Sequence, residues 1–152
     1  MSKYVATLAN GGTRYSMHFL NKITTNDGKI EEEYQPKVES KIEIKKENLD
    51  AIFRGMFLVT TGPRGTLRSY FKDFPVNVAA KSGTAQQSSK RSEHTTFVAF
   101  APLEDPQISV CVIIPFGNGT TGPAPKVAKA AISEYLKLDY EPELKSYDTL
   151  LH

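Results

Sequence analysis

The sequence is most informative at Val78-Ala79-Ala80-Lys81-Ser82-Gly83-Thr84-Ala85-Gln86. This stretch opens with small apolar residues that suit a buried strand, and it continues with a cation, a hydroxyl, a glycine and a second hydroxyl. Successive side chains of a strand point to opposite faces, so Lys81 and Gly83 share one face while Ser82 and Thr84 share the other. Gly83 has no Cβ, which lets a ligand or another backbone approach closely. We therefore predict a strand that can receive a carboxylate or an oxyanion.

Three other segments surround this strand in a defined order, at residues 4–15, 62–71 and 97–102. In order and spacing, the set closely resembles the C-terminal part of the transpeptidase domain of class B penicillin-binding proteins. The resemblance runs from about residue 3 to residue 138. Lys81-Ser82-Gly83 matches the third of the three short motifs that characterise this superfamily.

The resemblance implies a role for each residue of the motif. In the family, a serine attacks the penultimate D-alanine carbonyl of a peptidoglycan stem peptide, and β-lactams acylate the same serine. Lys81 would join the active-site hydrogen-bond network and supply positive potential. Ser82, Gly83 and Thr84 would line the substrate or antibiotic site, and the backbone N–H of Thr84 would be one of two oxyanion donors.

The nucleophile implied by the resemblance is not found in this sequence. The family places it in Ser-x-x-Lys and follows it with Ser-x-Asn, and the chain has no Ser-x-Asn. Its one Ser-x-x-Lys string, Ser69-Tyr70-Phe71-Lys72, lies just before Lys81 in a segment that matches another part of the family pattern. We interpret it as a chance match. We therefore expect one wall of a serine D,D-transpeptidase site that is inactive alone; the alternative is a non-catalytic binding or interaction module derived from the same fold.

Composition points to one ordinary globular domain. The chain has 152 residues, 39% of them hydrophobic and 24% charged, and a net charge of +2 that is too small to argue for a nucleic-acid partner. Its single cysteine, Cys111, cannot form an internal disulfide. The three histidines, His18, His94 and His152, show no metal-ligand spacing, so we expect neither metal nor cofactor.

The resemblance also bears on location. Class B proteins carry an N-terminal membrane anchor and hold this domain on the outer side of the bacterial cytoplasmic membrane. This sequence has no apolar stretch close to the ~20 residues that a membrane span needs. We therefore expect a soluble piece of a membrane-anchored protein.

Periodicity predicts an α+β fold in which a three-strand antiparallel meander is flanked by helices. We expect a helix over 3–9, a hairpin flap over 13–45 whose first strand is 14–23, a second helix beginning near Leu49, the motif strand over 76–86, and a last helix over 123–137. Two further strands are expected over 94–101 and 108–114. The domain should span 1–138, with a tail over 139–152.

Two predictions concern which faces are buried. In the last helix, we expect Val127, Ala130, Ala131 and Leu136 to face the sheet. The strand over 108–114 is almost wholly apolar, which suits a strand buried on both faces. In the family this strand is flanked by a strand from the N-terminal part of the domain, which is missing here. We therefore predict that this missing part is a partner, and that the isolated chain self-associates through strand 108–114.

Overall fold

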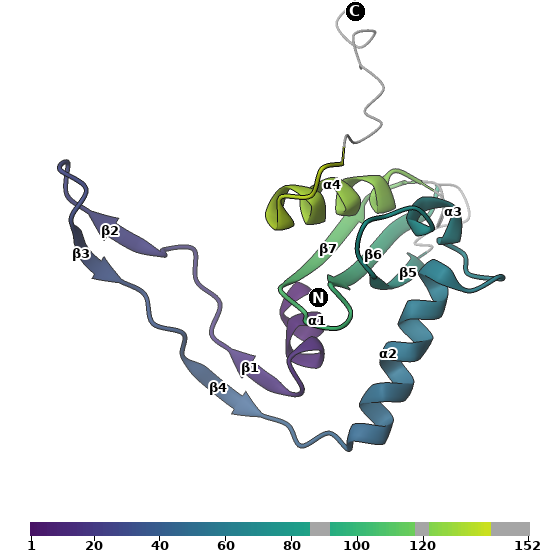
Figure 1. Cartoon of the computed structure of the whole chain (residues 1–152), viewed down its shortest axis with the longest axis horizontal. Helices are drawn as coiled ribbons and strands as arrows, with labels where there is room; N and C mark the ends of the chain where they lie inside the picture. The colour runs from purple at the N-terminus through teal and green to yellow at the C-terminus, as the bar shows by residue number, and fades with distance from the viewer. Residues whose placement is uncertain (86–91, 118–121, 141–152) are drawn as a thin grey trace, which may run out of the picture.

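The computed structural model describes residues 1–85, 92–117 and 122–140. Its centre is an antiparallel sheet of β5 (Ala79–Ala85), β6 (His94–Ala101) and β7 (Ile108–Ile114), in the order β5-β6-β7 (Figure 1). The predicted α+β class and three-strand meander are confirmed. The motif strand begins at Ala79, later than the expected start at residue 76. Gln86 and most of the loop predicted over 87–93 lie outside the described residues.

Helices cover both faces of the sheet. On one face lie α4 (Ala124–Leu136) and the short α3 (Arg68–Phe71); on the other lie α1 (Ser2–Ala9) and part of α2 (Lys46–Thr61). Alternate residues of β6 feed the two layers, since Phe97 packs with the α3 and α4 side chains and Phe100 with those of α1 and α2. Both rings are fully buried. The middle strand therefore ties the two halves of the core together.

The face that α4 turns to the sheet differs from the prediction. Its buried residues are Ala124, Ala128 and Ile132, spaced by four along the helix, together with Pro125 and Ser133. Val127 is 51% exposed and Ala131 is also exposed, so the prediction was wrong for these two residues. The apolar stripe of α4 is wider than the surface that the sheet covers, which sequence periodicity alone could not reveal.

Strand β7 is also less buried than predicted. Only Val110 among its residues is buried, and the Ile113 side chain is 58% exposed. The physical reason is its position: β7 is an edge strand that pairs only with β6 among the described strands. A nearly continuous apolar run indicated burial on both faces, but the chain provides side chains to cover only part of it.

Residues 13–45 form an arm that extends away from the body (Figure 1). It consists of β1 (Thr13–Tyr15) paired with β4 (Val38–Lys41), and β2 (Lys22–Thr24) paired with β3 (Ile30–Glu33). The single strand predicted over 14–23 is therefore two short strands. Pro36 lies in the opposing segment between β3 and β4, and a proline cannot donate to a ladder, which accounts for the interruption.

The arm is fixed to the body at the end of α1. The Gly12 carbonyl accepts from the Ile42 N–H at 2.9 Å, and a Cβ at Gly12 would lie 2.1 Å from the Ile42 carbonyl oxygen, so only glycine fits. The Glu39 carboxylate of the arm forms ion pairs with Lys3 at 2.6 Å and with Arg14 at 3.0 Å. Because Lys3 belongs to α1, the first of these pairs joins the arm to that helix. The domain bounds 1–138, with the arm as a flap within them, stay a prediction. Of the tail predicted over 139–152, only residues 139 and 140 belong to the described part of the chain.

Candidate functional site

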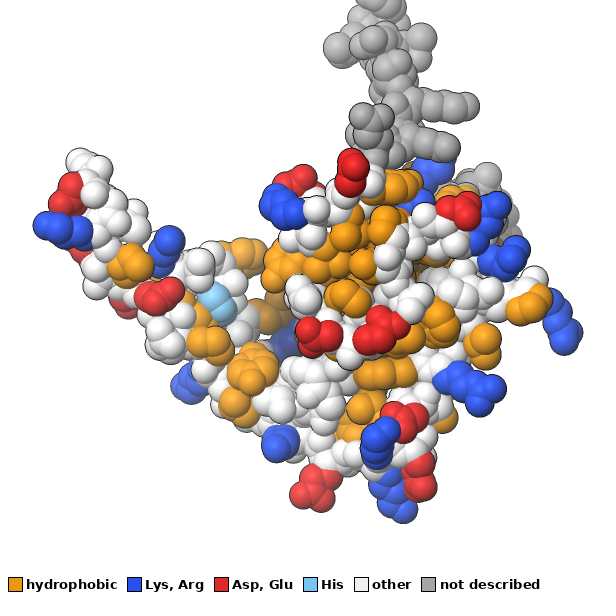
Figure 2. Space-filling view, in the orientation of Figure 1, with side chains coloured by type: hydrophobic (Ala, Val, Ile, Leu, Met, Phe, Trp, Pro, Cys, Tyr) orange, Lys and Arg blue, Asp and Glu red, His pale blue; other side chains and the backbone are white. Residues whose placement is uncertain are grey.

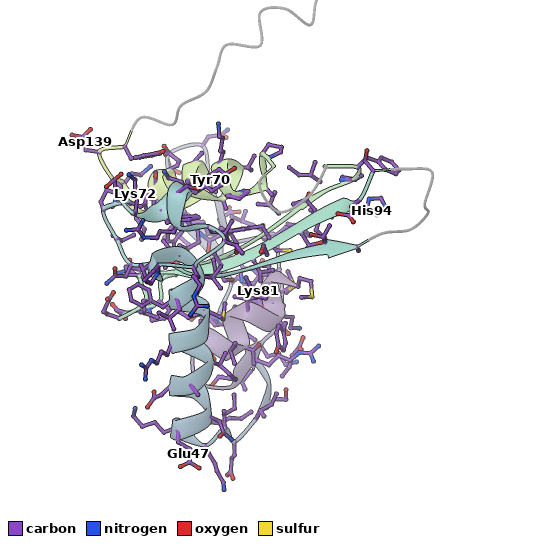
Figure 3. All side chains as sticks on the ribbon, turned by 90° about the vertical axis from the view of Figure 1, so that its right-hand side faces the viewer. Glu47, Tyr70, Lys72, Lys81, His94 and Asp139 are labelled. Carbon is purple, nitrogen blue, oxygen red and sulfur yellow. The ribbon has the colours of Figure 1, made fainter. Side chains whose placement is uncertain are left out.

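The predicted motif lies on β5, one of the two edge strands. Ala79 packs on the face of the sheet that α1 and α2 cover, and Ala80 packs on the face that α3 and α4 cover. The same alternation continues along the strand toward Ala85. Lys81 stands opposite Val98 on the α1/α2 face and is exposed, whereas Ser82 stands opposite Phe97 on the α4 face and is buried. Figure 3 shows Lys81 on the side of α1 and α2.

The direction of the β5 peptide groups can be read from the residues that lead into the strand. The Val78 carbonyl accepts the Thr60 hydroxyl of α2 at 2.6 Å, while the Asn77 carbonyl accepts the Leu103 N–H, just beyond β6, at 2.9 Å. The N–H and C=O of one residue point to the same side of an antiparallel strand, and successive residues alternate. The peptide groups of Ser82 and Thr84 therefore point away from β6, along the open edge.

The Lys81 side chain supports this direction. Its Nζ donates to the carbonyl of Ser82, an oxygen that would be engaged by β6 if it pointed inward. Among the described residues, no carboxylate lies within ion-pair distance of Lys81. The edge thus brings together an uncompensated ammonium group and the outward Thr84 N–H, which is the combination that stabilises an oxyanion or a carboxylate.

Gly83 is not required by the packing of this chain. A Cβ built there would meet only Thr96, at 3.8 Å, which is ordinary van der Waals contact. Its backbone is not in a left-handed conformation either, since the glycines with positive φ are Gly11, Gly12 and Gly28. Packing against the described residues therefore does not explain why a glycine stands at this position.

The Ser69-Tyr70-Phe71-Lys72 string lies on the other face of the sheet. It coincides with α3, where the Phe71 ring stacks on Phe97 with centroids 6.1 Å apart. Figure 3 shows Tyr70 and Lys72 beside α4, across the sheet from Lys81. This position supports the interpretation of the string as a chance match, because Lys81 and this helix face opposite layers.

Two histidines have local partners. The His18 ring stacks on Tyr34 with centroids 3.4 Å apart, and the Nδ1 of His94 accepts the Phe116 N–H at 3.2 Å. His152 lies outside the described residues. Within residues 1–85, 92–117 and 122–140, no three His, Cys, Asp or Glu side chains gather in a metal-like group, and no helix has the length and apolar character to cross a membrane.

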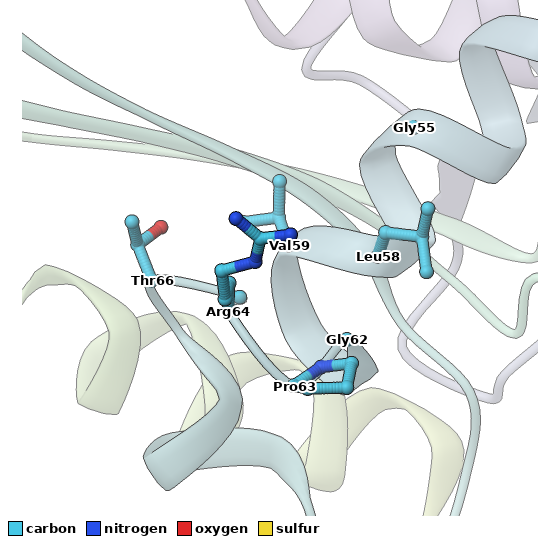
Figure 4. A pocket seen from close by; sticks show the side chains of 8 residues that line it. Gly55, Leu58, Val59, Gly62, Pro63, Arg64 and Thr66 are labelled. Atoms are coloured by element: carbon cyan, nitrogen blue, oxygen red, sulfur yellow. The ribbon is translucent and has the colours of Figure 1, made fainter.

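The structure adds features that sequence reasoning did not identify. Thr60, near the end of α2, is fully buried and ties that helix to β5; a hydroxyl on the buried side of an amphipathic helix was the only available signal. A pocket of about 480 Å³ lies at the same end of α2 (Figure 4). It is lined by α2 and the loop that follows: Gly55, Leu58, Val59, Gly62, Pro63, Arg64, Gly65 and Thr66. None of its lining residues belongs to the motif strand.

Comparison with known protein families identifies the family to which the chain belongs. Residues 1–134 match the model of the penicillin-binding protein transpeptidase domain. The chain belongs to that family. The resemblance predicted from the motif and its neighbouring segments is therefore confirmed.

Individual relatives agree with this assignment. The chain is 31% identical to Penicillin-binding protein 2B of Streptococcus pneumoniae over 93% of its length and 22% of that protein's. It is 32% identical to the Peptidoglycan D,D-transpeptidase MrdA of Escherichia coli over 91% of its length and 24% of that protein's. The solved structure of penicillin-binding protein 2B from S. pneumoniae strain R6 superposes with a TM-score of 0.76 at 29% identity, covering 91% of this chain and 24% of that one. The chain thus spans about a quarter of the length of these relatives.

Proposed function

We propose that this chain forms the Lys-Ser-Gly-Thr wall of a peptidoglycan D,D-transpeptidase active site. The observation that carries the proposal is the open edge of β5, where the ammonium group of Lys81 and the outward N–H of Thr84 lie on one strand of a penicillin-binding protein fold. The substrate would be the stem peptide of peptidoglycan. β-Lactams would bind the same edge as mimics of that peptide.

Each residue has a separate role in this proposal. Lys81 holds positive potential at the site and stays exposed to reach the ligand. Ser82 and Gly83 shape the edge along which the ligand lies, and the Ser82 and Thr84 side chains contact its carboxylate. The Thr84 N–H donates to the oxyanion of the tetrahedral intermediate, and the loss of one such donor costs ~10²–10³ in rate. The second donor is the N–H of the nucleophilic serine.

We further propose that this chain is inactive alone. Without the Ser-x-x-Lys serine there is no covalent route, whatever the quality of the oxyanion donor. The serine and the Ser-x-Asn motif would come from the N-terminal part of the same domain, which is thus the first partner. In the complete protein, the domain would lie on the outer side of the bacterial cytoplasmic membrane, where its substrate is.

Fluorescent penicillin separates this proposal from a non-catalytic module. The chain is incubated with the probe, denatured and run on a gel, in parallel with the complete domain. We expect a labelled band for the complete domain and none for the chain. A stoichiometric band from the chain that disappears in Ser69→Ala would overturn our interpretation of that string. A complete domain that never labels would favour the binding module.

The remaining partner that we propose is a second copy of this chain, bound through strand β7. The strand is an edge, apolar in sequence, and partly exposed. Such edges pair readily with other strands.

A further inference from the structure

The proposed oxyanion donor lies close to one end of the sheet. Thr84 is the second-last residue of β5, and its own peptide groups point away from β6. Its position therefore depends on its two neighbours, Gly83 and Ala85, whose peptide groups face β6. Ala85 pairs with His94, and this pair is the last of the ladder. Because the ends of secondary structure fray most easily, the direction of the Thr84 N–H depends on what holds this last pair together.

A tight turn after β7 lies at the same end of the sheet. The Gly117 N–H donates to the Ile114 carbonyl at 3.2 Å, which closes a turn over residues 114–117 with a proline in the second place and Phe116 in the third. Ile114 also ends β7 and pairs with Thr95 of β6. The turn therefore begins beside the first residues of β6, the strand that pairs with the end of β5.

The turn adopts a conformation that its own sequence does not favour. Phe116 has a φ of 57°, in the left-handed region. Turns that need a positive φ in the third place favour glycine or asparagine there. A bulky residue in this region is an outlier that persists only where the surrounding structure holds it. The conformation of Phe116 therefore points to contacts outside the turn that keep it in place.

His94, the first residue of β6, makes two such contacts. Its Nδ1 accepts the Phe116 N–H at 3.2 Å, and its ring lies against the Phe116 ring with centroids 4.8 Å apart. An imidazole nitrogen that accepts a hydrogen bond carries no proton, so this contact uses the neutral ring with its proton on Nε2. Figure 3 shows His94 at the end of the sheet where β5 also ends. The His94 side chain thus bonds to the turn, while its backbone pairs with Ala85.

Gly117 lets the turn approach the next residue of β6. A Cβ built at Gly117 would lie 2.8 Å from the Thr95 hydroxyl oxygen and 3.1 Å from the Ile114 side chain. Thr95 is fully buried, so its hydroxyl has little room to move aside. A side chain at this position would therefore push the turn away from β6. The turn rests on two consecutive residues of that strand, His94 and Thr95.

We propose that His94 is a positioning residue of the transpeptidase site: it joins the 114–117 turn to the last pair of the β5–β6 ladder and so sets the direction of the Thr84 N–H. This inference rests on the function proposed above. His94 acts through Thr84, without touching the substrate. The tetrahedral intermediate develops its charge on one oxygen, and a displaced donor stabilises that charge less well. Binding of the ligand before acylation also uses Lys81, so it should change less than the acylation step.

Stopped-flow acylation of the complete domain by a fluorescent penicillin tests this role. Its dependence on penicillin concentration gives both the dissociation constant of the complex before acylation and the acylation rate constant. His94→Phe keeps a ring against Phe116 and removes the acceptor. A displaced donor costs less than the ~10²–10³ of a lost one, so we expect the rate constant to fall ~10-fold and the dissociation constant to stay within a few-fold.

Three further variants sharpen the test. His94→Asn keeps an acceptor oxygen close to the place of Nδ1, so it should restore the acylation rate constant to within a few-fold of wild type. Gly117→Ala disturbs the same contact from the side of the turn and should lower the rate constant with His94 intact. His18→Phe is the matched control, because His18 stacks on Tyr34 of the arm, and it should change neither constant. Circular dichroism checks that each variant is folded.

The outcomes separate this inference from the proposed function. Wild-type rate constants in folded His94→Phe and Gly117→Ala would overturn the positioning role. So would a His94→Asn as slow as His94→Phe, because the acceptor would then not be what matters. Lys81→Ala in the same assay reports on the site itself. If it also acylates at the wild-type rate, the proposed transpeptidase site is wrong; if it is slow while His94→Phe is normal, only the role of His94 is overturned.

Discussion

The two edges of the sheet differ in what they offer to solvent. Both β5 and β7 pair with β6 over seven residues, and both leave alternate peptide groups unpaired by the sheet. On β5, these groups lie beside the ammonium group of Lys81 and the hydroxyls of Ser82 and Thr84, and the last two residues of the strand are exposed. On β7, the strand contains no charged residue, and the Ile113 side chain is 58% exposed.

The comparison shows that two open edges of one sheet can differ in the kind of partner that they suit. Backbone N–H and C=O groups give any edge the capacity to bind an extended partner. The side chains decide which partner. A cation beside an outward N–H favours a carboxylate or an oxyanion, whereas aliphatic side chains favour another apolar strand. The same topology therefore gives this sheet two chemically different edges.

The largest expected effect comes from a substitution in β6, the strand that pairs with both edge strands. Phe97 of β6 is fully buried and stacks on Phe71, so Phe97→Ala should destabilise the chain by ~3–5 kcal/mol. Urea denaturation followed by circular dichroism measures this change. Phe19→Ala is the control, since Phe19 is 106% exposed on the arm. Equal effects of the two substitutions would mean that β6 does not organise the core.

Thr60→Val should affect one edge more than the other. It leaves the buried carbonyl of Val78 without its hydroxyl partner, which costs ~1–3 kcal/mol. Hydrogen exchange should accelerate in β5 before it does in β7. Thr61→Val is the matched control, because the Thr61 hydroxyl bonds only within its own helix, to the Phe57 carbonyl. Uniform acceleration in both strands would show that Thr60 supports the whole sheet rather than its β5 edge.

Lys81→Ala should leave the stability of the isolated chain within ~0.5 kcal/mol of wild type, as exposed substitutions usually do. Among the described residues, the Lys81 side chain bonds to the neighbouring Ser82 carbonyl alone, and water can satisfy that carbonyl at an exposed edge. The same urea denaturation measures the change. A loss comparable with that of Thr60→Val would assign Lys81 to the fold and weaken its assignment to the ligand site.

The smallest effect is expected at the base of the arm, far from the β5 edge. The Lys3 hydrogen bond, together with the charges of Lys3 and Arg14, lowers the pKa of Glu39 from its ordinary value of 4.5. A depressed carboxyl pKa contributes stability above the unfolded pKa, and that contribution is lost as pH falls through the folded pKa. An NMR titration should show the Gly12 and Ile42 amide signals shifting below pH 4.5, and Glu39→Gln should abolish that shift. If the amide signals of β5 shifted over the same pH range as those of Gly12 and Ile42, the titration of Glu39 would not be confined to the base of the arm.

Much of this fold could be predicted from local sequence. The bounds of β6 and β7 match the predicted segments, because each is an apolar run closed by polar or turn residues. The helix predicted over 3–9 ends at Ala9 as expected, and the two glycines that follow, Gly11 and Gly12, adopt the positive φ that ends a helix. Lys81 and Thr84 could be placed on a strand from the same local pattern.

What could not be predicted depends on partners far along the chain. Nothing near Val127 or Ala131 indicates that the sheet is too narrow to cover them. The outward direction of the Thr84 N–H can be read only from the contacts of Val78 with Thr60 of α2 and of Asn77 with Leu103 just beyond β6. The break in the arm depends on Pro36 across the ladder rather than on residues 14–23 themselves. Sequence patterns report which residues are apolar, and tertiary packing decides which of them are covered.

The central claim is that the β5 edge is the ligand edge of a penicillin-binding active site. Stopped-flow acylation by a fluorescent penicillin, measured in the complete domain, tests it most directly. Thr84→Pro removes the outward N–H, and Lys81→Ala removes the cation. We predict that each slows acylation by ~10²-fold or more in protein that remains folded, while Ile30→Lys on the exposed arm leaves the rate unchanged. Acylation rates of the two β5 variants within a few-fold of wild type would contradict the account.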